Sequence, residues 1–193
     1  MSGELPVRLA LPGRTLLLVA GMPGAGKSTL LADLPAHPAV VAIDSQAYRG
    51  PFRRVLPAWL PYAAYRPLVH IVHRLAVVRA AFSRTPTVVV HLPATDSSTR
   101  AAVARLAAIT GRQAHLLWLH VDPDEARRGQ RVRGRVVPSR SFARHAAQAA
   151  QTMAELLGGR HPDGWRSVTV LNRARASAGL RLDPAEQALG LHK

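Results

Sequence analysis

An eight-residue stretch early in the chain reads Gly21-Met22-Pro23-Gly24-Ala25-Gly26-Lys27-Ser28. It satisfies the Walker A pattern, in which a glycine and four free positions precede Gly-Lys-Ser. Glycines let the backbone curl so that successive N–H groups point at one phosphate; the lysine reaches the β- and γ-phosphates, and the serine hydroxyl binds Mg²⁺. The stretch predicts a site for ATP and Mg²⁺ formed by Gly21, Met22, Pro23, Gly24, Ala25, Gly26, Lys27, Ser28 and Thr29.

The residues on either side of this loop have the order that phosphate binding requires. Apolar Thr15–Ala20 precedes the loop and predicts a buried strand, and Ser28–Leu34 follows it as a helix that ends at Pro35. Lys27 is also one of two lysines in a chain with 24 arginines. A glycine-rich turn with an incidental lysine is the alternative interpretation, and this context disfavours it.

Apolar runs alternate with helical patterns along most of the remaining chain. This alternation predicts a three-layer α/β fold with a five-stranded parallel sheet flanked by helices. Together with the Walker A stretch, it predicts a P-loop NTPase fold. A further helix start is expected at Asp183–Pro184, from the capping residue and the proline. The other expected strands are 39–43, 87–91, 114–121 and 167–171, and the other expected helices are 62–84, 96–109, one that opens at 122–123, and 139–157.

Length and composition exclude several classes of protein. The 193 residues are 48% hydrophobic and 19% charged, which excludes disorder and predicts one compact domain over residues 1–193. The chain contains no cysteine, so no disulfide framework or thiolate chemistry is expected. No apolar run approaches the roughly 20 residues that cross a bilayer, and the first residues resemble no signal peptide. We therefore expect a cytoplasmic protein without a membrane partner.

The motif and the order of elements resemble the small P-loop kinases related to polynucleotide 5′-kinases, zeta-type toxins and chloramphenicol phosphotransferases. In that group, a carboxylate at the end of the second strand approaches the substrate hydroxyl, and an arginine often follows. The resemblance assigns these positions to Asp44 and Arg49, with Tyr48 and Arg53 beside them in the substrate site. Asp44 would accept the hydroxyl proton or orient the attacking oxygen. A helix cap is the alternative role for Asp44.

The third expected strand departs from the pattern of this group. Val88-Val89-Val90 is followed by His91, where many relatives have an aspartate that holds Mg²⁺ through water. Asp96, five residues further on, is one replacement for that acid, and Asp44 is another, as a metal ligand beside Ser28. A polar residue at a strand end is the simplest role for His91.

A basic segment, Arg127–Arg144, resembles the lid of such kinases, a helical hairpin that closes over ATP. Lid arginines neutralise the transferring phosphate, and the resemblance assigns this role to Arg128 and Arg131, with Arg135 next. Arg131 and Arg135 would also share one face of a helix, since they are four residues apart. A solvated charged face is the alternative interpretation of this basic segment. At the end of the chain, residues 173–193 are expected to form a C-terminal tail.

The net charge of +15 favours partners that carry phosphates. Five aromatic residues are interleaved with arginines between positions 48 and 66. Three roles are open for them: they could stack a base, enclose a small acceptor, or pack a helical hairpin.

The expected function is ATP-dependent phosphorylation of a hydroxyl. A polynucleotide 5′ end is the first candidate acceptor, and a nucleoside, amino-sugar or antibiotic is the second. A non-catalytic NTP-binding regulatory module is the alternative class.

Overall fold

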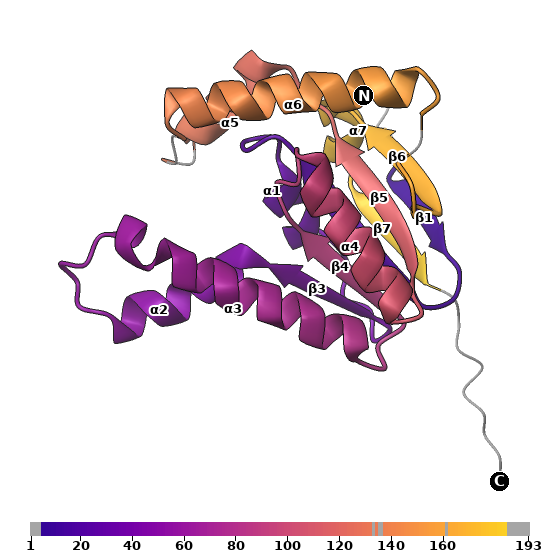
Figure 1. Cartoon of the computed structure of the whole chain (residues 1–193), viewed down its shortest axis with the longest axis horizontal. Coiled ribbons are helices and arrows are strands. Elements are labelled where there is room, and N and C mark those ends of the chain that lie inside the picture. Colours follow the sequence, from indigo (N-terminus) through magenta and orange to yellow (C-terminus); the bar gives the residue numbers. More distant parts are fainter. Residues whose placement is uncertain (1–4, 133, 135–136, 161, 185–193) are drawn as a thin grey trace, which may run out of the picture.

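A five-stranded parallel sheet forms the centre of the computed structural model, which describes residues 5–132, 134, 137–160 and 162–184 (Figure 1). The strand order is β3-β4-β2-β5-β6, so the strand that leads into the glycine-rich loop is central. The expected α/β fold with a five-stranded parallel sheet is confirmed. The strands are β2 (Thr15–Gly21), β3 (Val40–Asp44), β4 (Thr87–His91), β5 (Gln113–Leu119) and β6 (Ser167–Leu171).

The central strands are buried because both faces of the sheet are covered. All seven residues of β2 are buried, and Trp118 of β5 is fully enclosed. Strands buried on both faces have nearly continuous apolar sequences, which is why the runs in this chain are easy to recognise. The helices are α1 (Lys27–Ala32), α2 (Arg49–Val55), α3 (Tyr62–Phe82), α4 (Ser97–Ile109), α5 (Pro123–Val132), α6 (Ser139–Leu157) and α7 (Arg173–Ser177), with a 3₁₀ turn η1 at Ser45–Tyr48.

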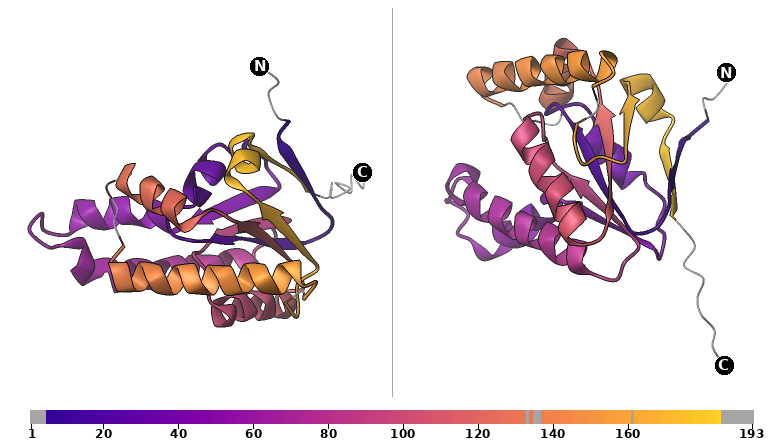
Figure 2. Two further views of the ribbon diagram at one scale, coloured as in Figure 1. Left: turned by 90° about the horizontal axis from the view of Figure 1, so that it is seen from above. Right: turned by 45° about the vertical axis from the view of Figure 1, so that its right-hand side comes forward.

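The two faces of the sheet carry different helices. Helices α3, α4 and α6 lie on one side, and α1 and α7 lie on the other (Figure 2). Right-handed crossovers produce this division, because the chain moves across the sheet in one direction from β2 to β3 and in the opposite direction through β4, β5 and β6. The carboxyl ends of all five strands therefore lie at one edge, where α/β proteins bind their ligands.

Two short strands near the ends of the described chain form a second, parallel sheet. β1 (Val7–Leu11) pairs with β7 (Leu180–Pro184), so the expected helix start at Asp183–Pro184 is wrong. The Asp183 carboxylate accepts two hydrogen bonds of 3.1 Å from the guanidinium of Arg8. Leu180 adds to the hydrophobic core from this strand. Residues 185–193, the rest of the expected tail, lie outside the described residues.

None of the helices in the described parts of the chain combines the length and the apolar character needed to cross a membrane.

Candidate functional site

The glycine-rich loop connects β2 to α1 at the carboxyl edge of the sheet. Its backbone is closely packed: an added Cβ would lie 2.4 Å from the carbonyl oxygen of Leu119 at Gly21, and 2.1 Å from that of Ala126 at Gly24. Both glycines have positive φ angles, of 138° and 93°, which side chains rarely adopt. Only glycine therefore suits these two positions. The Walker A pattern requires the first of them, Gly21, whereas Gly24 occupies one of its free positions.

The side chain of Lys27 folds back across the inside of the loop. This side chain is buried, and its ammonium donates hydrogen bonds of 2.7 Å to the carbonyl oxygens of Gly21 and Met22. A buried ammonium held by loop carbonyls is a fixed positive charge beside the loop. Ser28 and Thr29 follow at the start of α1, with Ser28 half-buried and Thr29 exposed. The expected phosphate-binding residues thus form one continuous turn of backbone.

The strand register brings the other candidate groups to the same edge. Asp44, the last residue of β3, pairs with His91 of β4, and His91 pairs with Val19 of β2, two residues before the loop begins. His91 Nδ1 lies 2.8 Å from Asp44 Oδ1. An ionised carboxylate only accepts, so Nδ1 carries the proton of this bond. Asp44 and His91 form a hydrogen-bonded pair beside the loop.

This pair is partly accessible to solvent. The side chains of Asp44 and His91 are 22% and 11% exposed, respectively. His73 of α3 lies behind them, with Nε2 3.4 Å from the carbonyl oxygen of Ile43 and its ring against the edge of Tyr48. Burial lowers the pKa of His73. The pairing of His91 with Asp44 was not expected from the sequence, where a lone histidine at a strand end gave no indication of its partner.

Asp96 has a structural role in this arrangement. It is the N-cap of α4, and its Oδ1 accepts hydrogen bonds of 2.7 Å from the backbone N–H of Thr99 and from the hydroxyl of Ser98. Burial raises the pKa of Asp96, but these hydrogen bonds outweigh it and hold the pKa below its ordinary value. The capping role predicted for Asp96 is confirmed.

Helix α5 packs directly on the glycine-rich loop. Gly129 approaches so closely that a Cβ there would lie 2.5 Å from the carbonyl oxygen of Gly24. Gln130 is buried, and it donates 2.9 Å to the carbonyl oxygen of Pro23 and accepts 2.8 Å from the N–H of Val137. Gln130 therefore connects the loop to the segment between α5 and α6. The lack of a side chain at Gly129 is what permits this close approach.

A second contact connects α6 to the loop between β4 and α4. The hydroxyl of Thr95 lies 2.7 Å from His145 Nδ1 and 2.9 Å from Gln148 Oε1. Burial is the main cause that lowers the pKa of His145, and the charges of Arg144 and Lys27 lower it further. These contacts hold α6 against the loop between β4 and α4, and His145 lies close enough to Lys27 for its charge to act on the imidazole.

The arginines predicted for the lid lie on or near α5. Arg128 and Arg131 are exposed, whereas Arg127 lies over the ring of Phe142 at 4.6 Å and joins α5 to α6. Arg135 lies outside the described residues, and α5 ends at Val132, so its expected helical relation to Arg131 is not tested. Arg128 and Arg131 remain predictions as phosphate ligands.

The predicted acceptor residues follow β3 directly. Tyr48 is half-buried at the end of η1, Arg53 is exposed on α2, and the Arg49 side chain is outside the described atoms. Phe52 stacks on Tyr65, with their ring centres 6.3 Å apart. These ring contacts, with that of Tyr48 and His73, support the hairpin-packing interpretation for part of the aromatic segment.

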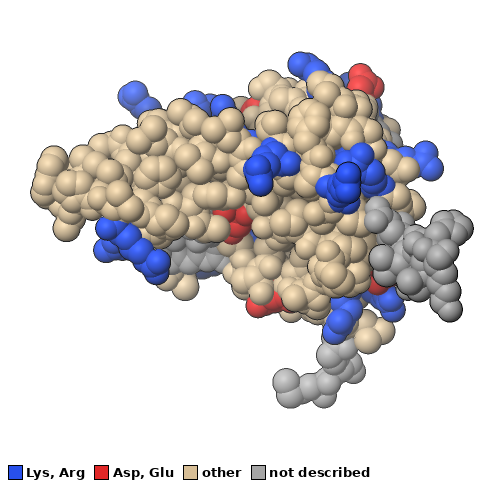
Figure 3. Space-filling model, turned by 90° about the horizontal axis from the view of Figure 1, so that it is seen from below, with Lys and Arg blue, Asp and Glu red and all other residues tan. Residues whose placement is uncertain are grey.

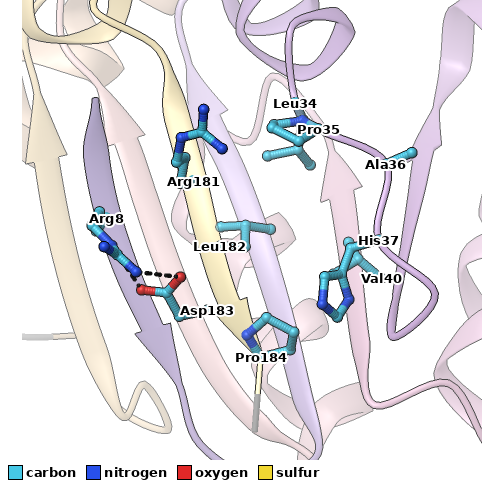
Figure 4. Close-up of a pocket in the computed structure, with 10 residues that line it drawn as sticks. All are labelled: Arg8, Leu34, Pro35, Ala36, His37, Val40, Arg181, Leu182, Asp183 and Pro184. Atoms are coloured by element: carbon cyan, nitrogen blue, oxygen red, sulfur yellow. Dashed lines mark hydrogen bonds and ion pairs between the residues drawn. The ribbon is translucent and has the colours of Figure 1, made fainter. Parts of the chain in front are cut away.

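A cavity of about 770 Å³ lies away from these groups. It lies between the β1–β7 sheet and the loop after α1, and includes Val40, the first residue of β3 (Figure 4). Asp44 ends the same strand, so the cavity is toward the opposite edge of the sheet from the Asp44–His91 pair. This cavity is therefore separate from the candidate site.

Two glycine substitutions should have opposite effects on the stability of the protein, because Gly129 packs against the loop and Gly50 has open space around it. Gly129→Ala should destabilise the protein by about 1–3 kcal/mol, because the added methyl overlaps the Gly24 carbonyl. It should also weaken ATP binding severalfold by displacing the loop. Gly50→Ala, at a helical glycine with open space around it, should stabilise by up to about 1 kcal/mol. Urea denaturation of both variants measures the difference, and equal effects would contradict the close packing.

The fold and the loop define a P-loop protein with a five-stranded parallel sheet. The model of the AAA domain family matches residues 16–156, and the chain belongs to this family. No curated protein sequence matches it significantly.

Two solved structures are similar to the chain in fold. One is from the PezAT toxin–antitoxin system of Streptococcus pneumoniae, with 14% identity over 90% of this chain and 72% of that chain, at a TM-score of 0.58. The other is a proposed kinase from Chloroflexus aurantiacus, with 16% identity over 83% of this chain and 86% of that chain, also at 0.58. The narrower group suggested by the sequence, of polynucleotide 5′-kinases, zeta-type toxins and chloramphenicol phosphotransferases, stays a prediction.

Proposed function

We propose that this protein transfers the γ-phosphate of ATP to a hydroxyl of its substrate. The observation that carries the proposal is the Asp44–His91 pair. His91 ends β4, the strand next to the one that leads into the glycine-rich loop, and Asp44 ends β3, the next strand beyond it. A fixed lysine, a cradle of loop amides and a carboxylate at one edge are the groups that phosphoryl transfer needs.

In this reaction the acceptor oxygen bonds to the γ-phosphorus while the bond to the β–γ bridging oxygen breaks. ADP leaves with the electron pair, and the hydroxyl proton passes to Asp44. Lys27 stabilises the negative charge on the phosphates, and Arg128 and Arg131 would approach from α5. His91 holds Asp44 in place through Nδ1, so that the carboxylate meets the hydroxyl in one orientation.

Mg²⁺ fits this set of residues as an ion held mainly by the nucleotide. Within the described parts of the chain, no three His, Cys, Asp or Glu residues gather as a metal site. Mg²⁺ in phosphoryl-transfer sites is commonly bound by substrate phosphates, waters and one or two protein oxygens. The Ser28 hydroxyl and the Asp44 carboxylate are the oxygens proposed here, and the ion would neutralise phosphate charge.

Transfer of labelled γ-phosphate tests this proposal directly. The acceptors are 5′-OH oligonucleotides, nucleosides, amino-sugars and other small alcohols, each incubated with the protein, ATP and Mg²⁺. Label on any acceptor supports a kinase and identifies its substrate class. If ATP binds tightly but label passes to none of them, the NTP-binding regulatory module is the better proposal, and the replacement of the usual strand-end acid by His91 would explain it.

The polynucleotide 5′ end is the acceptor that the charge of +15 favours most. For an oligonucleotide held by about three phosphate contacts, KM should rise roughly twentyfold between 50 and 200 mM salt, because higher salt reduces the free energy gained when binding releases counterions. KM for a neutral small alcohol should hardly change, which makes the alcohol the control. Steady-state kinetics at several salt concentrations measure both. An oligonucleotide KM that is independent of salt would argue for a small-molecule acceptor.

A further inference from the structure

Helix α3 exposes a continuous line of apolar side chains to solvent. Their exposed fractions range from 41% to 63%, and they follow one another at spacings of three, four, three and four residues. This repeat is that of the a and d positions in a coiled coil. We refer to this set as the α3 seam, and its members are Leu68, Ile71, Leu75, Val78 and Phe82.

The seam lies on the face of α3 opposite the one that packs on the sheet. Val69, His73 and Val77 are buried on the inner face, whereas the seam residues project away from it. A helix that is apolar on both faces is normally covered on both faces. In Figure 3 the arm formed by α2 and α3 is largely free of charged side chains on the side shown, with Lys and Arg at its margins.

The charges beside the seam all have one sign. Arg74 and Arg79 occupy the g and e positions that border it, both are exposed, and α3 contains no acidic residue. In a coiled coil, the e and g positions select the partner through charge. A partner with acidic residues at these positions would complement both arginines.

We infer that the α3 seam docks an acidic amphipathic helix of a partner protein. A second copy of this chain would bring the arginines of one α3 close to those of the other, and each chain carries a net charge of +15. A lipid surface would favour a broad apolar face, whereas the seam is the narrow a and d line typical of helix pairing. From Leu68 to Phe82 the line is about 21 Å long, which is two heptads.

The docked helix would lie behind the phosphate-transfer site. The inner face of α3 carries His73, which contacts Ile43 and Tyr48 near Asp44, and the seam lies on the other side of the same helix. Docking is therefore independent of nucleotide binding, and Lys27→Ala should bind the partner helix as well as the wild-type protein does. Failure of the proposed kinase activity would leave this inference standing.

The probe for this inference is a synthetic 21-residue helix with leucine at every a and d position and glutamate at every e and g position. Fluorescence anisotropy with the full chain at physiological salt should show saturable binding. The double variant Ile71→Lys with Leu75→Lys should weaken it at least tenfold. Ile109→Lys, at a 73% exposed apolar residue at the end of α4, is the matched control and should bind normally.

A second variant tests charge selection. Arg74→Glu with Arg79→Glu should lose the glutamate helix and bind the same helix with lysine at e and g. If the wild-type protein fails to bind the glutamate helix, or if the double lysine variant binds it equally well, the inference is overturned. A dimer in sedimentation, or binding to phosphatidylserine vesicles, that disappears in the double lysine variant would assign the seam to a second copy or to a lipid surface instead.

Discussion

Lys27→Ala is expected to reduce phosphoryl transfer by roughly 10³-fold or more. The ammonium is buried, and it is held by two loop carbonyls at 2.7 Å, so it forms a fixed charge beside the phosphates. Its loss also removes the hydrogen bonds that close the loop. We expect weaker ATP binding together with the lower rate, measured by calorimetry with Mg²⁺ and by transfer of labelled phosphate.

Arg105→Ala is the matched control for this substitution. It removes one positive charge from the exposed side of α4 and should leave both ATP binding and turnover unchanged. Lys27→Arg retains the charge but not the compact shape of an ammonium, so we expect it to restore little activity. Full activity of Lys27→Ala would remove the nucleotide site from the glycine-rich loop, and the kinase proposal with it.

The sheet could be predicted from the sequence because both of its faces are buried. Continuous apolar runs then mark the strands, and the helices between them have clear boundaries: Asp96 caps α4 as expected, and α6 begins and ends at Ser139 and Leu157 as predicted. The glycine-rich loop could be predicted for a different reason. Its residue types are determined by backbone conformation and by phosphate chemistry, and both are local in sequence.

The features that could not be predicted depend on residues far apart in the chain. β1 pairs with β7, and no local pattern indicates that Asp183 meets Arg8 rather than starting a helix. Arg112 is a second example, because nothing in the sequence distinguishes it from the other arginines of a chain that has 24. It is buried, and its guanidinium donates to the carbonyl oxygens of Ala81 near the end of α3, Thr15 at the start of β2 and Pro86 just before β4.

Contacts between distant residues also explain why only part of the candidate site could be predicted. The loop was identified from its Walker A residues and Asp44 from its position at a strand end, but His91 entered only as a departure from an expected acid. Its function as the partner of Asp44 depends on the register of β3 and β4, which residue types alone do not determine. The role of Gly129, which lets α5 approach Gly24, likewise depends on how the helix packs on the loop.

Asp44→Asn is expected to reduce the rate of transfer by about 10²–10⁴-fold while ATP affinity stays near that of the wild-type protein. Asparagine has nearly the same shape and retains an oxygen that accepts from His91 Nδ1, so the pair can persist. It cannot take the hydroxyl proton at neutral pH. The rate therefore falls without a matching loss of ATP binding, which separates this variant from Lys27→Ala. Single-turnover transfer and ATP calorimetry measure the two effects.

Asp96→Asn is the control for Asp44→Asn, because it removes a carboxylate near the same edge of the sheet while asparagine still caps α4. It should transfer phosphate at the wild-type rate with an unchanged Mg²⁺ requirement. His91→Gln should lower the rate less than Asp44→Asn does, since it loosens the orientation of the carboxylate but leaves its charge. A loss below threefold for Asp44→Asn would give this carboxylate a structural role only. An inactive Asp96→Asn would instead assign the missing strand-end acid to Asp96.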